Sequence, residues 1–184
     1  MTRLLVLAGP TAVGKGTIVR RLVERYGDVW VSVSATTREP RPGEIEGVDY
    51  YFVSDARFDE MIAERELLEW AVVHGEHRYG TPRAAVLRHL AAGIPCILEI
   101  DLSGARQVRD AMPNATFVFV EPPSWAELVR RLELRGTEDE DERIRRLATA
   151  RVEMGAADEF EHVVVNDDLD AAVDAVHALL VEER

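Results

Sequence analysis

The chain carries short, mostly apolar runs, and stretches with helical periodicity lie between or after them. The apolar runs cover residues 4–8, 97–100, 117–120 and 163–165. Runs of this length and character are typical of strands buried on both faces of a parallel sheet. Apolar residues recur at helical spacing over residues 18–26, 82–92, 102–111, 125–135 and 169–180. The alternation predicts an α/β fold in which helices flank a mostly parallel sheet.

Two stretches depart from this alternation. Residues 29–81 contain an arginine- and proline-rich segment, then a β-rich run at 50–53, then a helical pattern from about residue 55 to 65. This arrangement indicates a subdomain inserted into the α/β core. Residues 125–157 are densely charged and helical in pattern, and the acidic run at their centre is typical of a solvated loop and helix start.

Composition narrows the class of protein. The 184 residues are 47% hydrophobic and 30% charged, which suits one globular domain. No apolar run approaches the roughly 20 residues of a membrane helix, so we expect a cytoplasmic protein. The net charge of -12 argues against nucleic-acid or anionic-membrane partners, although clustered arginines can still bind a small anion. Cys96 is the only cysteine, which excludes an intramolecular disulfide, and its apolar neighbours favour burial.

One lysine stands out against this background. Lysine and arginine together number 22, and Lys15 is the only lysine among them. It ends a G-x-x-x-x-G-K motif that begins at Gly9, with a predicted strand before it and a predicted helix after it. In such a loop, backbone N–H groups converge on phosphate oxygens, and the lysine reaches the β- and γ-phosphates of a nucleotide. The alternative is a glycine turn with an exposed lysine. The motif predicts an ATP site formed by Gly9, Pro10, Thr11, Ala12, Val13, Gly14, Lys15, Gly16 and Thr17.

The residue after the lysine makes the expected metal site unusual. Gly16 stands where many such loops carry a Ser or Thr that ligates Mg²⁺, and a hydroxyl appears only at Thr17. We therefore assign no direct protein ligand to the metal. Mg²⁺ is expected on the ATP oxygens, with waters and an acidic side chain, and Glu99 and Asp101 are the candidates at the end of a predicted strand. The alternative for Asp101 is a cap on the helix that begins near residue 102.

Arginines and hydroxyls gather in the predicted insertion. Ser34, Arg38, Arg41 and Tyr50 supply two guanidinium groups and two hydroxyls within a short stretch. Arginine pairs with phosphate through two charge-assisted hydrogen bonds, so this set suits a phosphomonoester. The alternative is that these are exposed arginines without a role, in a chain rich in arginine.

At these residues the sequence resembles the guanylate kinase family, and the resemblance extends over essentially the whole chain. It implies a P-loop NTPase core, an inserted nucleoside-monophosphate-binding subdomain and a helical lid. The core would comprise residues 1–33, 82–124 and 158–184, the subdomain about 34–81, and the lid about 125–157. The matching segments are residues 32–44, 47–53, 68–71, 79–81, 99–101, 122–124, 135–138 and 165–169.

The resemblance also implies roles for single residues. Ser34, Arg38, Arg41, Tyr50 and Tyr79 would hold the phosphate of GMP. Glu69 and Thr81 would read guanine, and Glu99 and Asp101 complete the GMP site. Arg131, Arg135 and Arg146 would contact the ATP phosphates from the lid, and Asn166 would lie near adenine. The catalytic set would be Lys15, Arg38, Arg131, Arg135 and Arg146.

These residues predict ATP-dependent phosphorylation of GMP, and of dGMP, by in-line transfer in purine nucleotide metabolism. Two alternatives keep the fold. A phosphopeptide-binding scaffold domain would keep the arginines, but such domains typically lack the intact loop at Gly9, Gly14 and Lys15. A kinase of a ribose phosphate would not need the pair Glu69 and Thr81, which suits a pocket that reads a base.

Overall fold

A computed structural model describes residues 3–73, 77–134 and 140–181. Its main sheet has five strands in the order β2-β7-β1-β8-β9, and all adjacent strands are parallel. The predicted mostly parallel sheet is therefore confirmed. The strands are β1 (Leu4–Ala8), β2 (Trp30–Val31), β7 (Cys96–Glu99), β8 (Thr116–Glu121) and β9 (His162–Val165).

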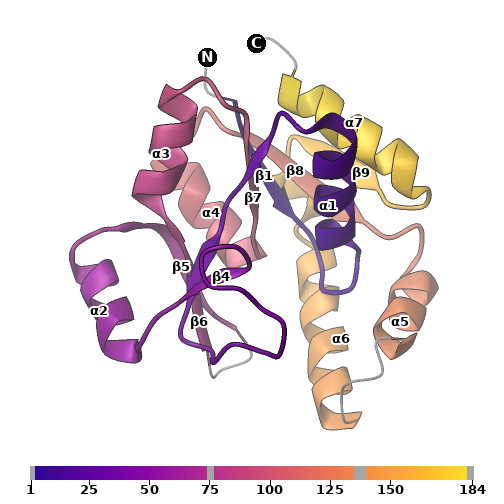
Figure 1. Ribbon diagram of the computed structural model, residues 1–184. Coiled ribbons are helices and arrows are strands. Elements are labelled where there is room, and N and C mark those ends of the chain that lie inside the picture. Colours follow the sequence, from indigo (N-terminus) through magenta and orange to yellow (C-terminus); the bar gives the residue numbers. More distant parts are fainter. Residues whose placement is uncertain (1–2, 74–76, 135–139, 182–184) are drawn as a thin grey trace.

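Alternating residues of β1 explain why helices cover both faces of this sheet. Leu5 and Leu7 pack into one buried cluster with α1 (Lys15–Tyr26) and α7 (Leu169–Val181). Leu4 and Val6 pack into a second cluster on the other face, with α3 (Arg83–Ala91) and α4 (Leu102–Ala111). All five β1 residues are buried, as expected for a central parallel strand. The resulting three layers are visible in Figure 1.

A second, four-stranded sheet lies beside the first. Its order is β4-β3-β6-β5, with β3 parallel to β4 and antiparallel to β6. Helix α2 (Asp55–Ala63) covers it through a small core that includes Phe58 and Met61. Figure 1 shows this sheet and α2 at the lower left. Its strands are β3 (Ser34–Thr36), β4 (Tyr50–Phe52), β5 (Leu67–Val73) and β6 (His77–Pro82).

The charged segment after β8 forms helices, as predicted. Helix α5 covers Trp125–Leu134 and α6 covers Glu140–Met154, followed by a 3-10 turn at Ala157–Glu159. Figure 1 shows α5 and α6 at the lower right, across the molecule from α2. Within the described ranges, no helix has the length and apolarity needed to cross a membrane.

The sequence located most of the core elements but missed part of the second sheet. Strand β1 and helix α4 have the predicted bounds, whereas α2 ends at Ala63, two residues early. The sequence predicts a strand in the insertion only at residues 50–53, but the structure also has β3 there, and residues 67–73 and 77–82 pair as the antiparallel strands β5 and β6. The sequence does not predict strand β2 either, because two half-buried residues are too few to show the alternation of apolar and polar residues that indicates a strand.

Candidate active site

The turn between β1 and α1 is shaped by two glycines. Gly9 has φ 146°, and a Cβ there would lie 2.4 Å from the backbone oxygen of Val120. Gly14 has φ 100° and forms the N-cap of α1. The first turn of α1 contains no acidic residue, so the positive end of the helix dipole faces the turn without a carboxylate of its own. This backbone is suited to binding a phosphate group.

Lys15 folds back over this turn. Its Nζ donates to the backbone oxygen of Gly9 at 2.6 Å and to that of Pro10 at 3.2 Å. On α6, Glu153 Oε2 accepts a hydrogen bond from the Thr11 backbone nitrogen at 3.3 Å. Burial raises the pKa of Glu153, and the charge of Lys15 acts in the opposite direction. Glu153 therefore joins the charged helix to the loop. Sequence reasoning missed it, because nothing distinguishes it from the other carboxylates of that segment.

A cleft of about 1100 Å³ opens beside Lys15. The loop, the four-stranded sheet, the end of β7 and helix α6 all contribute to its walls. The fold thus brings ten of the 22 predicted site residues to one cavity. Those that line it are Gly9, Thr11, Lys15, Ser34, Tyr50, Glu69, Tyr79, Glu99, Asp101 and Arg146.

A carboxylate and a hydroxyl face each other at the four-stranded end of this cleft. Glu69 is 5% exposed and Thr81 is fully buried, and they stand opposite one another on β5 and β6. Thr81 Oγ1 donates to Glu69 Oε1 at 2.6 Å. Burial raises the pKa of Glu69 to about 7; the hydrogen bond from Thr81 opposes this rise, and the nearby charge of Asp101 adds to it. A buried carboxyl with so few partners is poised to accept further donors from a ligand.

The raised pKa of Glu69 predicts a stability effect. Between pH 4.5 and about 7 the folded protein keeps this proton while the unfolded chain releases it. The contribution to stability is thus complete below pH 4.5 and is lost as the pH rises through 7. We expect the wild type to lose up to about 3 kcal/mol relative to Glu69→Gln between pH 5 and 8. Urea unfolding of both proteins measures this, and parallel pH curves would contradict it.

Arg38 lies behind the cleft wall rather than on it. It is 9% exposed, its Nε donates to Tyr79 Oη at 3.1 Å, and its guanidinium lies 5.3 Å from the Tyr50 ring centroid. Its Nη2 pairs with Glu44 Oε1 at 2.8 Å. This ion pair, helped by the Arg41 backbone nitrogen, lowers the pKa of Glu44. Arg38 is thus held against two tyrosines that do reach the cleft.

Arg41 occupies a different position from its predicted partners. Its side chain is exposed, and it is not among the residues that line the cleft. Its backbone nitrogen donates to Glu44 Oε2 at 2.7 Å, which fixes the turn between Arg38 and Glu44. In this structure Arg41 supports the neighbourhood of Arg38 through its backbone, by way of Glu44.

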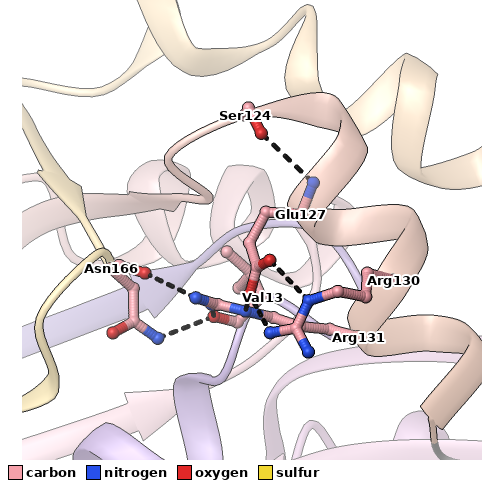
Figure 2. Close-up of polar contacts among 6 residues, drawn as sticks. All are labelled: Val13, Ser124, Glu127, Arg130, Arg131 and Asn166. Atoms are coloured by element: carbon pink, nitrogen blue, oxygen red, sulfur yellow. Dashed lines mark hydrogen bonds and ion pairs between the residues drawn. The ribbon is translucent and has the colours of Figure 1, made fainter.

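Arg131 on α5 contacts the loop between β1 and α1 at Val13 (Figure 2). Its Nη1 donates to the Val13 backbone oxygen at 3.2 Å and its Nη2 to the Asn166 backbone oxygen at 3.0 Å. Glu127 Oε1 accepts from Nε at 2.7 Å. All three nitrogens are therefore engaged with protein oxygens, and Arg131 does not line the cleft. Of the other predicted lid arginines, Arg146 lines the cleft, and Arg135 lies outside the described residues.

Asn166 packs directly on the same loop. Its side chain is 6% exposed, and Nδ2 donates to the Val13 backbone oxygen at 2.8 Å. A Cβ on Gly14 would lie 2.5 Å from that nitrogen, so the glycine makes this close approach possible. Figure 2 shows Asn166 and Arg131 converging on Val13. The contact fastens the end of β9 to the loop.

The carboxylates near Gly16 suit a hard cation. A Cβ on Gly16 would lie 3.4 Å from Glu99 Oε1, so Glu99 stands where a longer side chain at position 16 would project. Asp101 Oδ1 accepts from the Gly104 backbone nitrogen at 2.7 Å, which confirms the helix-cap alternative, and Asp101 also lines the cleft. Oxygen donors of this kind match the preference of Mg²⁺. Thr17 does not line the cleft. Over the described ranges, no group of three or more His, Cys, Asp or Glu residues could hold a metal.

Comparisons with known proteins agree with this geometry. The family model described as guanylate kinase matches residues 1–183. A guanylate kinase of Thermobifida fusca is 58% identical over 97% of this chain and 90% of its own length. One from Leifsonia xyli is 59% identical over 97% of this chain and 70% of its own. The crystal structure of guanylate kinase from Anaplasma phagocytophilum superposes with a TM-score of 0.78 at 32% identity, covering 96% and 83% of the two chains. The chain belongs to the guanylate kinase family.

Proposed function

We propose that the protein is an enzyme that transfers the γ-phosphate of ATP to GMP, yielding ADP and GDP. The observation that carries this proposal is a single cleft that joins a P-loop with its lysine to a buried carboxylate–hydroxyl pair. The P-loop and Lys15 suit a nucleoside triphosphate, and the pair Glu69 and Thr81 suits a base with several hydrogen-bond donors. dGMP, which carries the same base, is expected to be accepted as well. We place the reaction in purine nucleotide metabolism in the cytoplasm.

Guanine would be read by Glu69. The ionised carboxylate can accept from both N1–H and the exocyclic amino group, a pair of donors that adenine lacks. Thr81 has a single hydroxyl proton, and it is donated to Glu69 in this structure. Donation to guanine O6 therefore requires this bond to open when GMP binds. Before then, Thr81 holds Glu69 in the orientation that faces the cleft. A site whose buried polar groups stay unpaired with the wrong base rejects that base strongly.

The phosphate of GMP would lie by Ser34, Tyr50 and Tyr79, which line the cleft. Arg38 supplies positive charge from behind the two tyrosines. Its Nη2 is paired with Glu44, so a phosphate dianion would compete with that carboxylate for the guanidinium. Arg41 would join this group only if its exposed side chain turns inward.

Transfer needs positive charge around the moving phosphoryl group and the exclusion of water. Lys15 would leave its two carbonyl partners and bind the β- and γ-phosphates. Arg146 would add charge from α6, with Arg135 assigned by the resemblance alone. Arg131 would act mainly by holding the loop through Val13. Mg²⁺ would be held near Glu99 and Asp101, where it neutralises charge on the phosphates.

The acceptor can be tested with purified protein, ATP and Mg²⁺ in a coupled assay of ADP release. GMP, dGMP, AMP, CMP and UMP are supplied in turn. We expect kcat/KM for GMP to exceed that for AMP by about 10⁴-fold or more, because AMP leaves Glu69 without its donors. A preference for AMP, or no ADP release with GMP, would overturn the proposal.

A further inference from the structure

The strand that carries Glu69 is fastened to the core by helix α4. Strand β5 is an edge strand of its sheet, so one side of its backbone has no neighbouring strand within that sheet. At Trp70, the side chain of Gln107 on α4 takes the place of a neighbouring strand as the hydrogen-bond partner. Its Oε1 accepts from the Trp70 nitrogen at 3.2 Å, and its Nε2 donates to the Trp70 oxygen at 2.7 Å. One side-chain amide thus pairs with both backbone groups of the residue next to Glu69.

One turn earlier on α4, a glycine faces the carboxylate itself. A Cβ on Gly104 would lie 2.6 Å from Glu69 Oε2 and 3.2 Å from its Cδ. It would also lie 3.3 Å from Asp101 Oδ1, the cap of the same helix. Real Cβ atoms do not approach a heavy atom to 2.6 Å, so any side chain at this position would move Glu69.

The helix gains nothing from a glycine at this position. Gly104 is buried within a regular α-helix, and its backbone is not in the left-handed region that favours glycine. Glycine inside a helix costs about 1 kcal/mol relative to alanine. The feature that does require it is the space taken by the Glu69 carboxylate. The buried position of that carboxylate also explains its raised pKa.

We infer that Gly104 and Gln107 are positioning residues for base specificity, which fix the Glu69 carboxylate for guanine. This inference rests on the proposed function and extends it from β5 to α4. Helix α4 begins beside Asp101, which lines the same cleft, and Gln107 on this helix holds the backbone of Trp70, the residue next to Glu69. The core helix thereby sets the distance between the base-reading carboxylate and the P-loop.

Gly104→Ala tests the inference, because alanine favours the helix while its methyl group displaces Glu69. We expect KM for GMP to rise about ten- to a hundredfold, since a shift of about 1 Å can cost that much. KM for ATP should stay within twofold of wild type. Ser103→Ala is the matched control: it lies one position earlier on α4, it is exposed, and it should behave as wild type in both measurements.

A rescue experiment separates positioning from general damage. Glu69→Asp shortens the carboxylate by one methylene, so in the Gly104→Ala background it relieves the contact. We expect the double variant to bind GMP better than Gly104→Ala alone, although Glu69→Asp weakens binding in the wild-type background. The inference fails if Gly104→Ala keeps a wild-type KM for GMP, or loses ATP and GMP equally. Failure of the proposed function is a different result: the wild type itself would not use GMP.

Discussion

Replacing Lys15 with methionine is expected to lower kcat by about 10²- to 10³-fold, the usual cost of removing one preorganised group that stabilises transition-state charge. Methionine is of similar length and cannot donate or carry charge. Stability should change little, because the hydrogen bonds from Lys15 Nζ to the Gly9 and Pro10 oxygens are to backbone groups at a partly buried turn. The measurements are turnover with saturating ATP and GMP, and the urea midpoint.

Arg20→Met provides the matched control for this substitution. It removes a positive charge from the exposed face of the same helix, five residues from Lys15. We expect it to keep turnover close to wild type, which separates local chemistry from the change in net charge. Comparable turnover in Lys15→Met and wild type would mean that the loop does not bind the transferred phosphate. Lys15→Arg should also be impaired, because its wide planar group does not replace a compact ammonium.

The second large effect is expected at Glu69. Glu69→Gln keeps the shape of the side chain and the bond from Thr81, but it replaces one acceptor with a donor and removes the charge. Two hydrogen bonds to a charged group are lost or weakened, so kcat/KM for GMP should fall by about 10²- to 10⁴-fold. KM for ATP should be nearly unchanged, because Glu69 lies at the end of the cleft formed by the four-stranded sheet, whereas ATP is expected at the P-loop.

The pH dependence sharpens this test. Only the ionised carboxylate accepts from both guanine donors, and burial raises the pKa of Glu69 to about 7. For the wild type, kcat/KM for GMP should therefore rise as the pH increases through 7, while Glu69→Gln should lack this step. Glu24→Gln, an exposed change on α1, should keep the wild-type profile. Equal losses for ATP and GMP in Glu69→Gln would remove the base-reading role.

The sequence predicted those parts of the fold whose signal is local. Strand β1 and the loop from Gly9 to Lys15 follow from consecutive residues: an apolar run, two glycines and a lysine before a helical period. The parallel core follows from the repetition of such units. The capping role of Asp101 was also accessible, because a cap lies immediately before the helix that it stabilises.

The features that were missed depend on contacts distant in sequence. The hairpin of β5 and β6 is stabilised by pairing and by packing on α4, and its mixture of polar and apolar residues gives no clean alternation. Gly104 carries no sign of its role until Glu69 is seen beside it. Glu44 lies within the segment 32–44 that resembles the family, but only the structure shows that its carboxylate pairs with Arg38. A linear pattern contains the residue types but not the partners.

For Arg131, the sequence predicted a phosphate partner, whereas the structure shows contacts within the protein. Its place on the face of a charged helix suggested a group free to meet phosphate, and the resemblance gave it that role. In the structure its guanidinium binds two backbone oxygens, one in the P-loop and one after β9. Sequence spacing gives the helix face of an arginine but not which oxygens it contacts.

The single lysine has a practical consequence for anyone who handles this protein. Reagents that acylate side-chain amines, including common dyes and coupling esters for solid supports, find only one such target in the chain, and it lies in the nucleotide loop. Attachment through lysine would therefore inactivate each molecule that it captures. A label is better attached to a cysteine introduced at the surface. Because Cys96 is buried, a thiol-reactive label would react with the introduced cysteine in preference to it.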